Sequence, residues 1–147
     1  MGIFDFFTSK PKTQPEYING IGELTYSSQF NEYAYRGKID SASLKYKIGI
    51  VFPTRNKAIS DYQKMYFKEL ERNINKILEE ASKIPSSKIV LADCIVDDIL
   101  IPDKENNSYD VDAEIVVSQK ERPNIYGTSI YTIIMKDLNV AEVIFIE

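Results

Sequence analysis

The sequence has no histidine, no tryptophan and one cysteine among its 147 residues. Without histidine, neither a Ser-His-Asp triad nor a Cys-His dyad is possible, and the commonest acid–base group at neutral pH is missing. One cysteine excludes an internal disulfide, and with histidine absent it also excludes a zinc site of Cys and His ligands. A chain of this length buries enough surface to fold as one domain without such cross-links.

Long apolar runs are also absent, and none approaches the ~18 residues that a membrane-spanning helix needs. The apolar residues 1–7 are too few for a signal peptide, and no basic region precedes them. The six glycines are scattered and form neither a P-loop nor a dinucleotide fingerprint. We therefore expect a cytoplasmic protein with no membrane partner and no nucleotide cofactor.

Charge is unevenly distributed along the chain, although the formal net charge is only −4. Residues 1–88 carry 14 Lys and Arg against 10 Asp and Glu, a balance of +4. Residues 89–147 carry 4 against 12, a balance of −8. Such asymmetry indicates either a charged partner or pairing of the two halves with each other.

Composition divides the chain into a short tip with a linker and one domain. Residues 1–16 hold an aromatic tip (Phe4, Phe6, Phe7) and then a polar stretch with two prolines, which is typical of a linker. The aromatic tip is expected to dock on the domain, to fray, or to meet a partner. Residues 17–147 are predicted to form a single domain.

Alternating hydrophobicity predicts three strands over residues 22–27, 33–39 and 44–52, and a long helix follows them. Ser60 is a good N-cap for the helix, and Gln63 completes a capping box. Apolar residues then recur at helical spacing until Pro85. At about 22 residues the helix would be ~33 Å long, enough to lie across a whole sheet.

The C-terminal part predicts three to four further strands. Residues 87–98 favour a second helix and residues 99–101 a short strand, with a strand reading of the first segment left open. Residues 111–117 alternate as a strand, and residues 130–135 and 140–146 form a hairpin. The fold class is thus α+β, with a mostly antiparallel sheet and the long helix packed on one face. The last strand is a possible sheet edge that could pair with a second copy in a homodimer.

Acidic residues are concentrated in residues 93–114, hereafter the acidic segment, where Lys104 is the only base. These eight residues are the candidate partner-binding residues: Asp93, Asp97, Asp98, Asp103, Glu105, Asp110, Asp112 and Glu114. Neighbouring acids such as Asp97 and Asp98 do not converge on one site if helical, so no catalytic residue is predicted. A calcium-loop register starts at Asp103, but Ser108 replaces its turn glycine, so no metal is predicted either.

Three interpretations of the charges compete. Acidic and basic strands could neighbour each other in the sheet and neutralise, the bases being Arg36, Lys38, Lys45 and Lys47. Alternatively, the acidic segment could dock a basic protein through complementary steering. Binding of nucleic acid by the basic strands ranks last, because the tyrosines alternate onto the opposite face and the pI is about 5.0.

Several short motifs resemble a loose group of uncharacterised bacterial α+β proteins associated with the immunity side of polymorphic toxin systems. The similarity covers residues 20–84 and continues through residues 110–114. The motifs run Gly22-Glu23-Leu24-Thr25-Tyr26, Tyr35-Arg36-Gly37-Lys38-Ile39, Ile48-Gly49-Ile50 and Gln63 at the helix start. The chain departs from the group in lacking a Trp and a His near the acidic stretch. The motifs are structural, so the resemblance implies no active site.

The leading hypothesis is therefore a non-enzymatic interaction domain, of the immunity-inhibitor kind, whose acidic segment meets a basic, toxin-like partner. The first alternative is a small-ligand-binding domain with a Tyr-lined cleft between helix and sheet. The second is a hydrolase that uses carboxylates alone. No cofactor is expected in the leading interpretation.

Overall fold

Eight strands and one long helix make up the part of the chain that the computed structural model describes, residues 14–29, 32–85, 87–104, 110–120 and 128–146. The aromatic tip predicted at Phe4, Phe6 and Phe7 lies outside these residues. The elements are β1 (Glu16–Ile18), β2 (Gly22–Gln29), β3 (Glu32–Asp40), β4 (Lys47–Pro53), α2 (Asp61–Ser82), the 3-10 turn η1 (Leu91–Asp93), β5 (Cys94–Leu100), β6 (Ala113–Lys120), β7 (Thr128–Lys136) and β8 (Asn139–Ile146).

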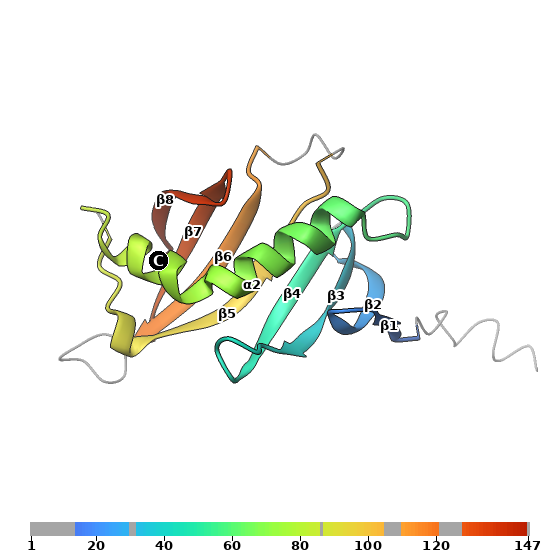
Figure 1. The fold of residues 1–147 in the computed structure, drawn as a ribbon, viewed down its shortest axis with the longest axis horizontal. Coiled ribbons are helices and arrows are strands. Elements are labelled where there is room, and N and C mark those ends of the chain that lie inside the picture. The colour runs from blue at the N-terminus through green and yellow to red at the C-terminus, as the bar shows by residue number, and fades with distance from the viewer. Residues whose placement is uncertain (1–13, 30–31, 86, 105–109, 121–127, 147) are drawn as a thin grey trace, which may run out of the picture.

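The strands form one sheet in sequence order, β1 to β8. Neighbours are antiparallel except β4 and β5, which run parallel. The parallel pair arises because α2 carries the chain back across the sheet between them (Figure 1). The α+β class and the mostly antiparallel sheet are confirmed, and the described residues hold one or two more strands than the six or seven predicted.

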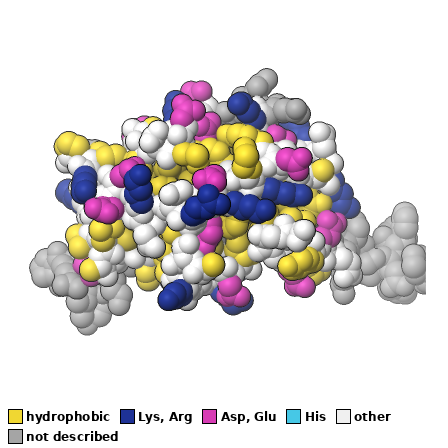
Figure 2. Space-filling view, in the orientation of Figure 1, with side chains coloured by type: hydrophobic (Ala, Val, Ile, Leu, Met, Phe, Trp, Pro, Cys, Tyr) yellow, Lys and Arg dark blue, Asp and Glu magenta, His cyan; other side chains and the backbone are white. Residues whose placement is uncertain are grey.

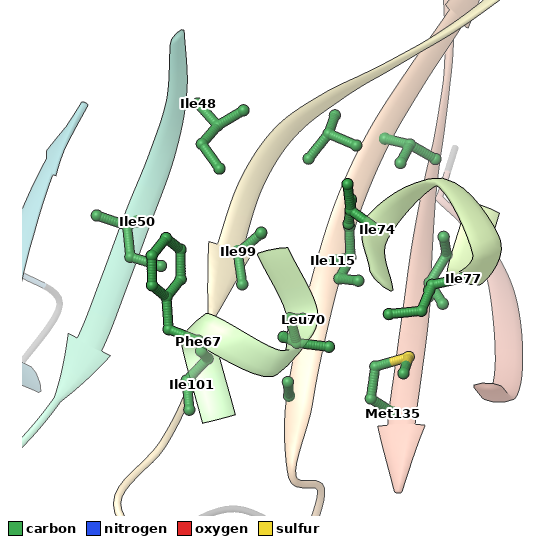
Figure 3. Packing of buried hydrophobic residues seen from close by; sticks show 14 of the residues in the cluster. Ile48, Ile50, Phe67, Leu70, Ile74, Ile77, Ile99, Ile101, Ile115 and Met135 are labelled. Carbon is green, nitrogen blue, oxygen red and sulfur yellow. The ribbon is translucent and has the colours of Figure 1, made fainter. Parts of the chain in front are cut away.

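The capping box at the start of α2 is present as predicted. The Ser60 hydroxyl accepts a hydrogen bond from the Gln63 N–H at 3.1 Å, and Gln63 Oε1 accepts from the Ser60 N–H at 2.9 Å. Phe67, Leu70 and Ile74 then lie against isoleucines of the central strands (Figure 3). Burial of this apolar stripe holds α2 on one face of the sheet.

The two faces of the sheet differ in cover. The helix face carries Ile50, Ile99 and Ile115, which are fully buried beneath α2. The opposite face, hereafter the open face, carries the intervening residues of each strand, because successive side chains point to opposite sides. Asp98 and Glu114 belong to this open face, because they are next in their strands to Ile99 and Ile115, which pair with each other on the helix face.

Three sequence predictions need correction. Residues 87–98 do not form a helix: after one 3-10 turn they become strand β5, where Val96 and Ile99 reach the core. The third strand begins at Lys47 and not at residue 44, because Lys45 has a left-handed backbone (φ 64°) that ends a turn. The strand predicted from residue 111 begins at Ala113, so Asp110 and Asp112 precede it. Strand β1, which begins inside the predicted linker, had no sequence prediction.

Basic side chains follow the outer surface of α2. Lys64, Lys68, Arg72 and Lys76 recur every four residues, and the last three are exposed. Figure 2 shows Lys and Arg side chains in a band across the middle of this face. Basic charge thus lies over the helix, whereas much of the acidic segment lies at the strand ends.

Candidate functional site

The fold distributes the eight predicted acidic residues over several places. Asp93 belongs to η1, and Asp97 lies at an irregularity of β5. Asp98 and Glu114 lie on the open face, and Glu105 is outside the described residues. The other three, Asp103, Asp110 and Asp112, surround one hollow. Sequence proximity therefore overstated how many of these acids share one surface.

The hollow, hereafter the acidic pocket, forms where four separate parts of the chain meet. They are the first turn of α2, the residues after β5, the residues before β6 and the β7–β8 turn. Its volume is about 300 Å³. The lining includes four aspartates, two lysines and a tyrosine: Asp103, Asp110, Asp112, Asp137, Lys104, Lys136 and Tyr62. The acids outnumber the bases two to one, so the lining is net negative.

Two hydrogen bonds, one to its side chain and one from its backbone, hold Asp112 beside the β7–β8 turn and Asp137. Asp112 Oδ2 accepts from the Asp137 N–H at 2.7 Å, and the Asp112 N–H donates to the Met135 carbonyl oxygen at 3.1 Å. Asp137 and Leu138 both have positive φ (51° and 62°), as in the tight two-residue turns that match the twist of a hairpin. The hairpin turn therefore holds one wall of the pocket in place.

The negative field of this wall reaches the start of α2. Burial raises the pKa of Tyr62, and the carboxylates of Asp112 and Asp137 raise it further. Burial also raises the pKa of Tyr66 to about 12, with the same two carboxylates adding to the effect. An ionised phenol is disfavoured here first because burial removes its hydration and then because it would add negative charge next to negative charge.

The chain itself places a cation in this environment. Lys104 Nζ lies 5.5 Å from the centroid of the Tyr62 ring, within the range of a cation–π interaction. Lys104 thus lies over an aromatic face in a hollow that four aspartates also line. These are the two features by which a protein surface recognises a lysine or arginine side chain.

On the open face, Asp98 is the residue of the acidic segment that faces one of the four predicted basic residues, whereas Lys47 pairs with Asp40 of its own hairpin at 3.8 Å. Gly49 pairs in register with Lys38 on one side and with Asp98 on the other. Because Gly49 has no side chain, the Asp98 carboxylate lies directly over it. Burial raises the pKa of Asp98, Asp97 raises it further, and Lys38 acts in the lowering direction.

Glu114 is not neutralised in this way. Burial raises its pKa, and the Glu32 carboxylate raises it further. Arg36 is not among the groups that act on the pKa of Glu114, although Glu32 of the same strand, β3, is. Arg36 instead donates to the carbonyl oxygen of Ser27 at 2.8 Å and to that of Glu32 at 3.4 Å. Neutralisation across the sheet therefore describes Asp98 better than Glu114.

The described residues also bear on three other features: a reactive thiol, a metal site and a membrane-spanning helix. Burial raises the pKa of the Cys94 thiol, which favours its protonated, less nucleophilic form. No three His, Cys, Asp or Glu side chains within the described ranges are grouped so as to hold a metal ion. In the same part of the chain, no helix has the length and apolar character to cross a membrane.

No protein-family model, curated protein or solved structure matches this chain. The interpretation of the pocket therefore depends on the residues that line it. Sequence reasoning missed Tyr62, Lys136 and Asp137 as pocket residues. The hairpin of residues 130–135 and 140–146 was predicted, but only the folded sheet brings its turn to the start of α2.

Proposed function

We propose that this chain is a non-enzymatic interaction domain that binds a basic protein partner through the acidic pocket. One observation carries the proposal: four aspartates from three separate parts of the chain line one hollow together with Tyr62. Carboxylates steer a basic partner toward the surface, and the aromatic face favours a cationic side chain once it arrives. A basic anchor residue of the partner would enter the hollow.

The partner is of the kind that immunity-type inhibitors bind, a basic toxin whose own target is negatively charged. An acidic inhibitor competes with such a target because both present negative charge to the same basic surface. The sequence resemblance to immunity-associated proteins supports this class of partner. The acids of the open face, Asp98 and Glu114, lie outside the pocket lining and are not assigned to the contact.

Binding of a fluorescent octa-arginine peptide, measured by anisotropy at low and physiological salt, tests the pocket. The double variant Asp110→Asn/Asp137→Asn should weaken binding by about tenfold, equivalent to ~1.4 kcal/mol. The matched control Glu23→Gln/Glu80→Gln removes the same charge elsewhere and should change binding by less than about twofold, since neither residue lines the pocket and salt screens charges away from it. Equal losses in both variants would mean that net charge, and not the pocket, attracts the peptide.

A second variant tests the pocket in the opposite direction. Lys104→Ala removes the cation that lies over Tyr62 and should strengthen binding of the same peptide. Lys76→Ala, which removes an exposed lysine from α2, is the charge-matched control. If the two variants bind equally, the ring of Tyr62 does not contribute to recognition.

A small cationic ligand is the second candidate, because the pocket volume of about 300 Å³ lies at the lower end of ligand-binding cavities. The helix–sheet interface predicted as a Tyr-lined cleft is instead packed with aliphatic side chains around Ile99 and Ile115 (Figure 3). A thermal-shift screen of guanidinium and amine compounds distinguishes the two functions. Stabilisation by a small amine that Asp137→Asn abolishes would favour the ligand-binding function.

A further inference from the structure

The two edges of the sheet differ in how well they are protected from pairing. Strand β1 has three residues and follows Pro15, so this edge offers few backbone groups to another strand. Strand β8 has eight residues, without proline, lysine or arginine, and is the last strand of the described sheet. Soluble proteins ordinarily place such residues on an exposed edge to prevent further pairing. The β8 edge has none of these three residue types, and Glu142 is its only charged side chain.

Apolar side chains are exposed on both faces of this edge. Ile144 and Ile146 are 41% and 45% exposed, and Phe145 between them is 52% exposed. On the open face, Ile146 continues into a cross-strand row with Ile130, which is 40% exposed. Exposed apolar residues at an unpaired strand edge indicate a surface that another strand covers.

We propose that β8 pairs antiparallel with β8 of a second copy, around a two-fold axis near Ile144. A register shift between Ile134 and Met135 of the β7–β8 pair leaves Glu142 to Ile146 as the regular part of β8. Centring on Ile144 pairs all five of these residues. It also places Val143 opposite Phe145, and it keeps the two Glu142 carboxylates from lying directly opposite each other.

A second copy fits this edge because β8 is complementary to itself. Antiparallel pairing places the open faces of both copies on the same side, so Ile144 meets Ile144 and the apolar surface becomes continuous. The acidic pocket lies by the turn at Lys136 and Asp137, away from the axis, and stays accessible. Five residue pairs form a contact that is small compared with a standard interface, which buries roughly 1,200–2,000 Å². The dimer is therefore expected to form only at high concentration.

Sedimentation velocity of the full chain between about 5 and 500 μM tests the proposal, since a weak contact implies a reversible, concentration-dependent shift toward the dimer mass. Ile144→Lys places like charges opposite each other at the axis and should abolish the shift. Met65→Lys introduces the same charge at a residue of α2 that is 59% exposed, and it should leave the shift unchanged. Circular dichroism verifies that both variants are folded.

Disulfide trapping provides a measurement that does not depend on a charged variant. In a Cys94→Ser background, which removes the only cysteine, Ile144→Cys should form a covalent dimer under mild oxidation. Met65→Cys is the control and should cross-link much more slowly. A chain that stays monomeric up to 500 μM, or equal cross-linking at the two positions, would overturn the proposal and leave the edge to a strand of another protein.

Discussion

The side-chain amide of Gln63 donates a hydrogen bond to the carbonyl oxygen of Ile101 at 2.9 Å. The same nitrogen donates to the Pro53 carbonyl oxygen, also at 2.9 Å, and the side chain is fully buried. Gln63 therefore joins the start of α2 to the ends of β4 and β5, the parallel pair. This attachment fixes Tyr62, the neighbouring residue, at the wall of the acidic pocket.

Replacing Gln63 with leucine should destabilise the fold by roughly 2–3 kcal/mol, because two buried carbonyl oxygens lose their donor. The capping box is lost as well, since Gln63 Oε1 accepts from the Ser60 N–H. Urea denaturation followed by circular dichroism measures the loss. Asn75→Leu, at an exposed position of the same helix, is the control, and similar losses in both variants would contradict the assigned role.

The contact between Gly49 and Asp98 predicts a coupled pair of substitutions. A Cβ at Gly49 would overlap the Asp98 carboxylate and lie 3.3 Å from the Asp97 carbonyl oxygen. Gly49→Ala should therefore cost about 1–3 kcal/mol, as overpacking does. Asp98→Ala should recover much of this loss in the double variant. A double-mutant cycle from urea denaturation measures the coupling, and strictly additive effects would rule out the contact as the cause.

Glu114 should make stability depend on pH. Burial and the Glu32 carboxylate raise the folded-state pKa of Glu114 above its ordinary value of 4.5, so the folded state binds the proton more tightly than the unfolded state. The contribution of this group to stability therefore falls as the pH rises from below 4.5 through the folded-state pKa. Glu114→Gln should stabilise the protein at pH 7 and lose that advantage at low pH.

Denaturation midpoints of wild type and Glu114→Gln, compared at pH 7 and at acidic pH, measure this effect. Glu23→Gln changes the same charge at an exposed position and serves as the control. An advantage of Glu114→Gln that stays constant over the whole pH range would show that ionisation is not the cause.

Neutralising Asp137 should lower the pKa of Tyr66 from about 12, although not to its ordinary value of 10.0, because burial is the largest cause of the shift. Asp137→Asn suits this test, since asparagine tolerates the positive φ of that turn residue. NMR titration of protein with ¹³C-labelled tyrosine rings follows the residue directly. Glu80→Gln should leave the same resonance unchanged, and an unchanged Tyr66 in Asp137→Asn would disprove the pocket's negative field.

Local sequence patterns correctly predicted a helix or strand where all the residues that define the pattern lie within that one element. The capping box and the apolar spacing of α2 lie within one helix, so the cap at Ser60 and the amphipathic helix after it were correctly predicted. The segment from residue 87 was predicted wrongly because its short apolar runs fit a helix or a strand equally well. Pairing of β5 with both β4 and β6 decides for the strand, and both partners lie outside the segment whose local pattern was ambiguous.

The sequence by itself determined the uneven charge, the absence of histidine chemistry and the long amphipathic helix, because each depends on composition or on local spacing. The tertiary structure decided which acids meet. Since α2 returns the chain so that β5 runs parallel to β4, the end of β5 reaches the start of β6 and the β7–β8 turn. Asp103, Asp112 and Asp137 therefore share one pocket, whereas Asp98 and Glu114, from the same acidic segment, lie on the open face.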